Sequence, residues 1–254
     1  MSTPRQVTPR AAVLVAPNPG PMTLEGTNTY LLRAPGAEGC VVVDPGPRHE
    51  GHLAAVAAAG PVVLILLTHG HADHADGARR LHELTGAAVR ALDRAHRLGE
   101  EGVGEGDVVA AAGVEVDVLA TPGHSADSLS FHLREDDAVL TGDTVLGRGT
   151  TVVAHPDGRL ADYLASLQRL RALGDATVLP GHGPELASAG VVAQEYLDHR
   201  TERLEQVRAA LAAGDGSPYE VVRRVYADVD PVLWPAAELS VRAQLDFLRE
   251  RPAG

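Results

Sequence analysis

Hydrophobic and polar positions along the chain repeat with two different periods. Residues 62–67 form an unbroken apolar run, which is typical of a buried strand, and residues 114–119 alternate apolar and acidic side chains, which is typical of a half-buried strand. Apolar runs at 138–140 and 177–179 indicate two more strands. Leucines recur every three or four positions across 160–173, so we predict an amphipathic helix there that packs on a sheet.

The order of these segments predicts the fold class. Residues 11–67 are expected to form short strands and turns, and residues 75–85 a helix that ends before Gly86, a residue suited to the position after a helix. Strand, loop, helix and strand follow one another in each half of the chain. This order favours an α/β fold, an αβ/βα sandwich in which two facing sheets are covered by helices.

The character of the sequence changes after Gly183. Three helices are expected beyond it, over residues 191–213, 218–228 and about 235–249. Ser217 and Pro218 suit the N-cap and the first position of the second of these helices. We therefore divide the chain into a first domain, residues 1–190, and a small helical C-terminal unit, residues 191–254.

Composition narrows the classes of function. The 254 residues carry a net charge of −12 and all 22 basic residues are arginines, so polyanions are repelled at long range and lysine chemistry is excluded. Eight aromatic residues leave few stacking platforms for single-stranded bases. We expect a cytoplasmic protein, because there is no membrane-length apolar stretch, no signal peptide, and a single cysteine, Cys40, that we expect to be buried.

Histidine and aspartate residues that could bind a metal ion follow the ends of the predicted strands. Directly after the apolar run 62–67, six residues contain His69, His71, Asp73 and His74. Each of the other three strands runs into a glycine-containing turn that carries one further candidate, namely His124, Asp143 and His182. Imidazoles and carboxylates that converge on one edge of a sheet sandwich are what a divalent metal needs.

This set of residues, in this order, resembles the metallo-β-lactamase superfamily. Segments 25–31, 142–151 and 196–203 are similar to the subgroup that contains the β-lactamase-like protein 2 endoribonucleases and many bacterial hydrolases of unassigned substrate. The resemblance implies a metallo-β-lactamase-like catalytic domain over residues 1–190, followed by a winged-helix-like unit. We expect that unit to be helical, without a two-stranded wing.

The resemblance also implies two metal sites in each chain. The ligand sets would be His69, His71 and His124 for one ion, Asp73, His74 and His182 for the other, and Asp143 as the bridge between them. Two such ions can share a water and lower its pKa, so that a bridging hydroxide attacks the substrate. Zn²⁺ suits these ligands best, and Mn²⁺ or Fe²⁺ also fits them. Asp73 is our candidate for delivering a proton to the leaving group, with a metal-bound water as the alternative.

Asp143 and His71 each separate this chain from one group of relatives. The zinc β-lactamases lack a bridging aspartate at this place, which argues against hydrolysis of lactam antibiotics. The flavodiiron proteins usually have glutamate where His71 stands, which argues against redox chemistry.

Three residues are our candidates for contact with substrate: Asn28, Thr150 and His199. A role of the Asn28 side chain in stabilising a turn explains this residue nearly as well. For His199 and its neighbour Arg200, the alternative is a position on a solvent-exposed face of a helix. Asp44 is either an outer partner of a metal-binding histidine or part of an Asx turn.

These observations rank three functions. The first is a dinuclear zinc hydrolase of a small ester, thioester or lactone, which the negative charge and the scarcity of aromatic residues favour. The second is a metal-dependent endoribonuclease acting on single-stranded RNA, which the subgroup resemblance favours. The third, a non-catalytic metal-binding module, is disfavoured because all seven ligands are present. The sequence predicts a small-molecule substrate and no membrane partner, and it does not predict an oligomeric state.

Overall fold

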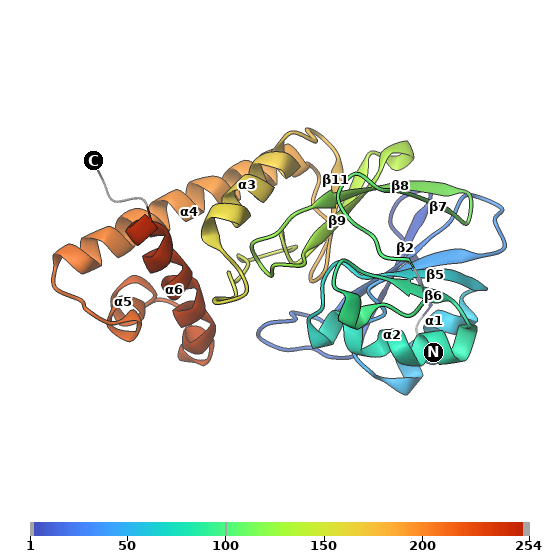
Figure 1. Cartoon of the computed structure of the whole chain (residues 1–254), viewed down its shortest axis with the longest axis horizontal. Coiled ribbons are helices and arrows are strands. Elements are labelled where there is room, and N and C mark those ends of the chain that lie inside the picture. The colour runs from blue at the N-terminus through green and yellow to red at the C-terminus, as the bar shows by residue number, and fades with distance from the viewer. Residues whose placement is uncertain (1–2, 100, 251–254) are drawn as a thin grey trace.

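The computed structural model describes residues 3–99 and 101–250. The molecule is elongated, with a sandwich of two sheets at one end and a group of helices at the other (Figure 1). This arrangement is the predicted αβ/βα sandwich with a helical C-terminal unit.

The first sheet has six strands in chain order, so each strand pairs with its sequence neighbour. β1 to β4 are antiparallel, whereas β4, β5 and β6 run parallel. The strands are β1 (Arg5–Gln6), β2 (Ala11–Val15), β3 (Asn28–Leu32), β4 (Cys40–Val43), β5 (Val62–Leu66) and β6 (Ala88–Arg90).

The second sheet has five strands in the order β11, β10, β9, β8, β7. Neighbours are antiparallel except β10 and β11, which are parallel. The strands are β7 (Val108–Ala111), β8 (Val114–Ala120), β9 (Leu129–Leu133), β10 (Ala138–Gly142) and β11 (Thr177–Pro180). The four strands predicted from apolar runs or from alternation are β5, β8, β10 and β11.

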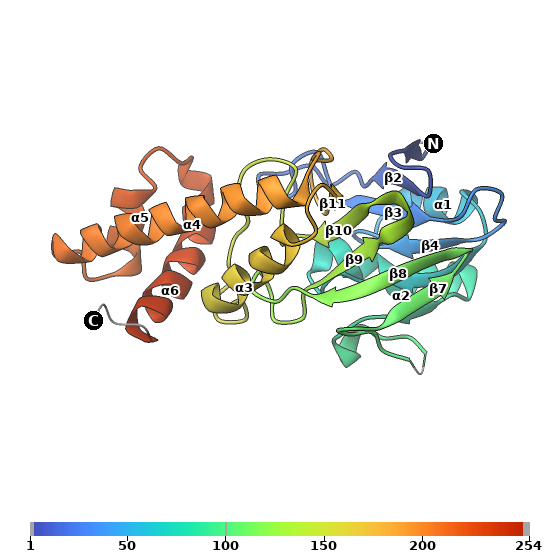
Figure 2. The same ribbon diagram turned by 90° about the horizontal axis from the view of Figure 1, so that it is seen from above.

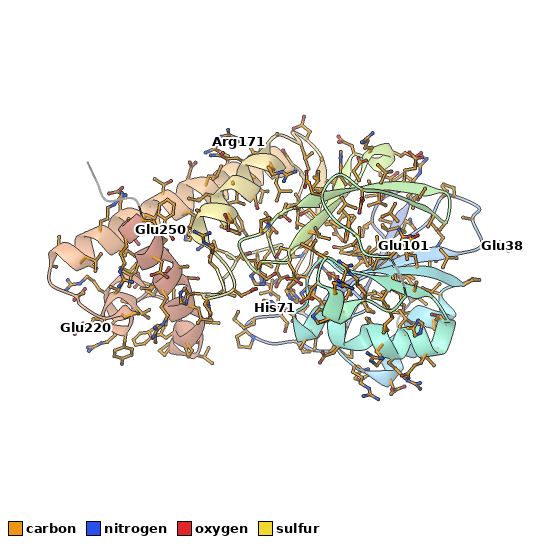
Figure 3. All side chains as sticks on the ribbon, viewed as in Figure 1. Glu38, His71, Glu101, Arg171, Glu220 and Glu250 are labelled. Carbon is orange, nitrogen blue, oxygen red and sulfur yellow. The ribbon has the colours of Figure 1, made fainter. Side chains whose placement is uncertain are left out.

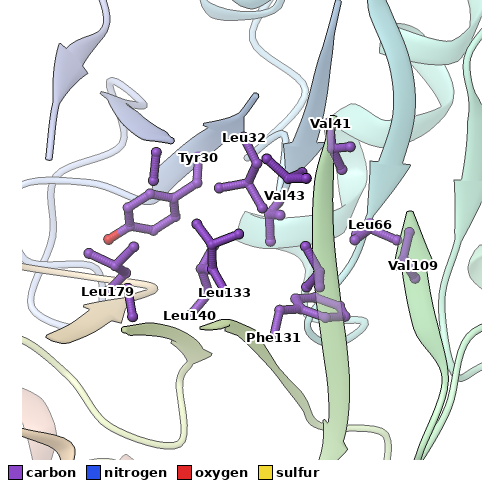
Figure 4. Close-up of a cluster of buried hydrophobic side chains, with 14 of the residues drawn as sticks. Tyr30, Leu32, Val41, Val43, Leu66, Val109, Phe131, Leu133, Leu140 and Leu179 are labelled. Atoms are coloured by element: carbon purple, nitrogen blue, oxygen red, sulfur yellow. The ribbon is translucent and has the colours of Figure 1, made fainter. Parts of the chain in front are cut away.

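The main core fills the space between the two sheets. Tyr30, Leu32 and Val43 face it from the first sheet, and Phe131 and Leu140 from the second (Figure 4). All five side chains are 2% exposed or less. Because both sheets bury a face in this core, the strand ends that carry the candidate ligands are held on rigid elements.

Helices cover the outer faces of the sandwich. α1 (Glu50–Ala58) and α2 (Ala72–Thr85) pack on the first sheet, and α3 (Leu160–Arg171) packs on the second. Gly86 ends α2 with a φ of 75°, as expected of a residue after a helix. Two short 3-10 turns complete the sandwich, Arg94–His96 and Arg134–Asp136.

One expectation about this region was wrong. Residues 11–67 contain α1 as well as strands and turns. Its sequence is rich in alanine and has no polar stripe opposite an apolar one, so the period of a helix is not visible in it. The helix is held by Leu53 and Val56, which are fully buried against the sheet and α2.

The C-terminal unit consists of α4 (Ala189–Ala212), α5 (Pro218–Val225), a 3-10 turn (Pro231–Leu233) and α6 (Trp234–Glu250). As expected, residues 189–250 contain no strand. Ser217 caps α5 through a capping box with Glu220. α4 runs beside α3 and continues past it toward α5 and α6 (Figure 2). In the part of α4 beyond α3, Val207 belongs to a buried cluster with Val221 of α5 and Val241 of α6.

No helix among the described residues combines the length and the apolar character that crossing a membrane requires.

Candidate metal centre

The seven candidate ligands lie at one end of the sandwich, where four strands stop. His69 and His71 follow β5, and Asp73 and His74 lie in the first turn of α2. The remaining three follow β8, β10 and β11 and are His124, Asp143 and His182. Figure 3 places His71 at the end of the sandwich that faces the C-terminal helices, and Glu38 at the opposite end.

Glycine lets the backbone of the last ligand loop approach the other ligands. A Cβ atom on Gly181 would lie 2.5 Å from Asp143 Oδ1 and 2.7 Å from His74 Cε1. A larger residue here would therefore displace the ligands themselves.

Ligand atoms gather in three overlapping groups, each with its atoms within 4.8 Å of one another. The groups are His69, His71 and His124; His69, His74 and Asp143; and Asp73, His74 and His182. In the first group, His124 Nε2 lies 3.0 Å from His71 Nδ1. In the last, His182 Nε2 lies 3.2 Å from His74 Nε2 and 3.1 Å from Asp73 Oδ2. Each group could hold a metal ion.

The carboxylate of Asp143 lies between the histidine groups. Its Oδ1 is 3.3 Å from His74 Nε2 and 3.4 Å from His182 Nε2. Its Oδ2 is 3.8 Å from His124 Nε2. The two oxygens of one side chain thus face different ligand sets.

Two of the buried ligand atoms form no hydrogen bond among the described residues: His69 Nε2 and Asp143 Oδ1. Asp143 Oδ1 lies within ion-pair distance of His74 and His182, so His69 Nε2 is the atom left without a partner. A buried polar atom without a partner costs about 1–3 kcal/mol. A cation beside His69 Nε2 would remove that cost, and mixed imidazole and carboxylate donors suit Zn²⁺, Mn²⁺ and Fe²⁺. The residues therefore fit a divalent metal.

The outer nitrogens of two ligand histidines are fixed by backbone carbonyls. His124 Nδ1 lies 2.7 Å from the Val152 carbonyl oxygen, and His182 Nδ1 lies 3.2 Å from that of Gly26. A carbonyl oxygen accepts a hydrogen bond, so Nδ1 carries the proton and Nε2 offers its lone pair to the site.

Asp44 braces two more ligands from behind. It is buried, it has a φ of 52°, and its carboxylate accepts hydrogen bonds from the Thr68 backbone N–H (2.8 Å), the Thr68 hydroxyl (2.6 Å) and His74 Nδ1 (2.8 Å). Because the Thr68 hydroxyl donates to Asp44, it accepts from His69 Nδ1 at 3.0 Å. Asp44 is therefore an outer hydrogen-bond partner of two candidate ligand histidines, which agrees with one of its two interpretations.

Charges at the site shift the pKa values in opposite directions. Burial lowers the pKa of His69 and His124. Burial also opposes protonation of His74 and His182, but Asp143 outweighs it, so the pKa of His74 is raised and that of His182 rises to about 9. Burial would raise the pKa of Asp143, and these two histidines hold it well below its usual range instead. Without metal, the site thus pairs protons on His74 and His182 with an ionised Asp143, and a divalent cation would displace those protons.

Comparison with known proteins identifies the family. The sequence model of the metallo-beta-lactamase superfamily matches residues 22–182. The chain belongs to the metallo-β-lactamase superfamily. The beta-lactamase associated winged helix domain matches residues 217–251, which correspond to α5 and α6 of the C-terminal unit.

Relatives of this superfamily member are similar over most of its length. A beta-lactamase-like protein 2 homolog from Caenorhabditis elegans is 34% identical over 83% of this chain and 74% of the relative. An atrochrysone carboxyl ACP thioesterase from Aspergillus fumigatus is 37% identical over 81% of this chain and 66% of that relative. The crystal structure of a metallo-beta-lactamase family protein from Thermus thermophilus superposes with a TM-score of 0.79 and 27% identity, covering 96% of this chain and 95% of the other. The superfamily and such thioesterase relatives make this chain a hydrolase.

A cavity of about 330 Å³ opens beside the metal ligands. It lies between the sandwich and the C-terminal unit, because its walls include His124 and Asp143 on one side and His199 of α4 and Ala237 of α6 on the other. Thr150, at the rim, also lines it. Two of the three residues predicted to contact substrate therefore line the cavity next to the ligands.

Asn28 has a different place. Its side chain is buried, and its amide nitrogen donates hydrogen bonds to the carbonyl oxygens of Pro180 (2.9 Å) and Gly183 (2.8 Å). These bonds fix both sides of the loop that carries His182. The geometry thus gives Asn28 a positioning role and offers no support for a contact with substrate.

Side chains of α3 and α4 hold the loop that carries Asp143, a function that the sequence did not reveal. The Tyr196 hydroxyl accepts from the Leu146 backbone N–H (3.1 Å) and donates to the Gly149 carbonyl oxygen (3.0 Å). Arg200 is 2% exposed, donates to the Thr151 carbonyl oxygen and stacks on Tyr163 at 5.0 Å. Arg200 therefore supports the loop from inside and does not lie on a solvated helix face.

Proposed function

We propose that this protein is a dinuclear metal-dependent hydrolase that cleaves a small thioester, ester or lactone. The observation that carries the proposal is the single carboxylate of Asp143 between two sets of histidines. One carboxylate shared by two ligand sets is the arrangement expected of a site for two ions.

Each ion would have its own ligands. His69, His71 and His124 would hold one, Asp73, His74 and His182 would hold the other, and Asp143 would serve both. Zn²⁺ fits this donor set best and Mn²⁺ or Fe²⁺ also fits. When bound, two such ions supply a water of lowered pKa and polarise the scissile carbonyl.

The protein's own residues orient the substrate and move protons. Hydrolysis adds the oxygen of water to the acyl carbon and breaks the bond from carbon to sulfur or oxygen, which gives a carboxylic acid and a thiol or alcohol. Burial would raise the pKa of Asp73, but its hydrogen bond with His182 lowers it, so Asp73 is ionised. Its side chain is 30% exposed at the site, where it can accept the proton of the attacking water and return it to the leaving group.

Among acyl substrates, a thioester has the most support. Relatives from Aspergillus fumigatus and Aspergillus chevalieri are named as acyl carrier protein thioesterases. The net charge of −12 disfavours long polyanions. A single-stranded RNA remains the second candidate, because the arginines that line the cavity could contact phosphates and because phosphodiester hydrolysis needs the same metal chemistry.

One preparation tests both candidates. Protein purified without chelator should contain two equivalents of Zn, Mn or Fe by elemental analysis. It should hydrolyse hexanoyl thioesters with little dependence on salt, and its RNA affinity should fall with salt with a log–log slope of about −0.7 for each phosphate contact.

Asp143→Asn serves as the control for contaminating enzymes. If the protein binds no more than one ion per chain after reconstitution with metal, the proposal of a dinuclear site is wrong. Specific RNA cutting at physiological salt that the control lacks, together with no turnover of thioesters, esters or lactones, would make the nuclease the correct assignment.

A further inference from the structure

The cavity beside the metal ligands differs in charge from the rest of the molecule. The chain as a whole has 34 acidic and 22 basic residues. In the cavity, the acidic residue is Asp143, a metal ligand, whereas three arginines line the walls: Arg148, Arg200 and Arg203. A cleft with one sign of charge in an otherwise oppositely charged protein attracts a ligand of the opposite charge.

Two of these arginines already have structural roles. Arg148 is half exposed and forms an ion pair with Glu25 at 2.6 Å, which it would have to give up to bind a substrate. Arg200 is buried against Tyr163, and one of its terminal nitrogens donates to the Thr151 carbonyl oxygen, while its Nε has no hydrogen-bond partner among the described residues.

Arg203 is held in place but its charge is not matched. One of its terminal nitrogens donates to the Val225 carbonyl oxygen (2.6 Å) and to Gln206 Oε1 (2.8 Å), and its guanidinium stacks on the Tyr226 ring at 4.6 Å. No carboxylate among the described residues forms an ion pair with it, although ion pairs are frequent elsewhere in the structure. Its position is thus fixed by uncharged partners, with donors left over.

His199 lies one helical turn before Arg203 on the same face of α4, and both line the cavity. The Nδ1 atom of His199 is buried and has no hydrogen-bond partner among the described residues. A donor or acceptor that is buried without a partner in a cavity wall is a place where a ligand can bind at little desolvation cost.

We infer that His199 and Arg203 form an anion-binding subsite, which recognises a negatively charged group of the substrate while its scissile carbonyl lies at the metal ligands. This inference rests on the proposed hydrolase function and names the substrate class more narrowly. Arginine supplies a planar array of donors that matches carboxylate and phosphate oxygens, and hydrogen bonds to charged groups are roughly twice as strong as neutral ones.

The anion has two possible chemical sources. It is either a carboxylate on the acyl group or a phosphate on the leaving group, such as that of a phosphopantetheine thioester. Three substrates distinguish them: the hexanoyl and adipoyl thioesters of N-acetylcysteamine, which differ by a terminal carboxylate, and hexanoyl coenzyme A, which adds phosphates on the leaving side.

The experiment compares kcat/KM of the metal-loaded full chain and of the variants Arg203→Gln, Arg203→Lys and Arg208→Gln. Wild-type protein should prefer at least one charged substrate over the hexanoyl N-acetylcysteamine thioester by about tenfold or more. Arg203→Gln should remove that preference and change hydrolysis of the neutral thioester by less than threefold. Arg203→Lys should restore part of it, because the charge returns. Arg208 lies on α4 outside the cavity and is paired with Glu205 at 2.5 Å, so Arg208→Gln should match the wild type.

Each outcome decides a different question. Preference for the adipoyl substrate assigns the subsite to the acyl group, and preference for the coenzyme A substrate assigns it to the leaving group. If the wild type hydrolyses the neutral thioester but shows no charge preference, or if Arg203→Gln slows all three substrates equally, the subsite is wrong while the hydrolase stands. If no thioester, ester or lactone is cleaved in excess of the Asp143→Asn control, the proposed function itself has failed.

Discussion

The strand ends of the sandwich and the inner face of α4 meet at the same cavity but are built in opposite ways. At the strand ends and in the first turn of α2, His74, His124 and His182 each have their outer nitrogen bonded to a partner, which fixes the orientation of the ring. On α4, His199 presents a buried ring nitrogen without a partner among the described residues, and Arg203 presents donors that its structural contacts leave free. From this difference we infer two separate roles. The sandwich carries the residues that catalyse the reaction, and the C-terminal unit carries the residues that select the substrate.

The largest effect is expected from a substitution of Asp143, the carboxylate that lies between the two histidine sets. Asp143→Asn keeps the shape of the side chain but removes the charge between the two histidine sets. We expect kcat/KM to fall by at least about 100-fold, because electrostatic stabilisation at a reacting centre is usually the largest single contribution to catalysis. Steady-state kinetics with elemental analysis of the same sample measures the loss of activity and of metal together.

A matched control is Asp76→Asn, because Asp76 is an exposed residue of α2 outside the ligand set. Its activity and metal content should equal those of the wild type. Near-full activity of Asp143→Asn would contradict the assignment of the bridging ligand.

A smaller effect is expected from a substitution of Asp44, which holds Thr68 and His74 by hydrogen bonds. Asp44→Asn replaces an oxygen that accepts from Thr68 or His74 with an amide that donates. Loss of such an outer partner typically lowers metal affinity by about 10–100-fold. Competition with a chromogenic chelator measures the affinity. An unchanged affinity, with the fold intact by circular dichroism, would mean that His74 needs no support from Asp44.

The smallest effect tests whether the helices also support the reaction. Tyr196→Phe leaves the Leu146 N–H and the Gly149 carbonyl without their partner, which costs about 1–3 kcal/mol of unfolding free energy. Because the loop that carries Asp143 loosens, we expect kcat to fall severalfold while two ions stay bound. Urea unfolding and kinetics on the same protein measure both quantities. Lower stability with unchanged kcat would confine the role of α4 to substrate selection and folding.

The sequence predicted the parts of the molecule that local patterns encode. The fold class and the strands that carry the ligands follow from apolar runs, each of which ends in a turn with a histidine or aspartate. α1 was missed because its alanine-rich sequence has no polar stripe. The helices of the C-terminal unit were predicted within a few residues of their observed ends, since their caps are written in the sequence.

Contacts between distant segments could not be predicted in the same way. Asn28 next to a threonine-rich turn gave no sign that its amide would bond to carbonyls at residues 180 and 183. Nor did Tyr196 indicate that its hydroxyl would hold a loop about 50 residues earlier in the chain. Such pairs depend on how the elements pack, so a motif identifies the ligands but not the residues that aim them.

Position 44 combines two requirements that few amino acids can meet together. Its φ of 52° is tolerated by glycine, asparagine and aspartate, whereas other residues are strained there. Its side chain accepts three hydrogen bonds through two oxygen atoms. Glycine has no side-chain oxygen and asparagine has one. The backbone and the side chain therefore narrow the choice to aspartate by independent routes. Asp44 supports His74 directly and His69 through Thr68. A substitution at this position would therefore disturb two candidate ligands, although Asp44 is not itself a ligand.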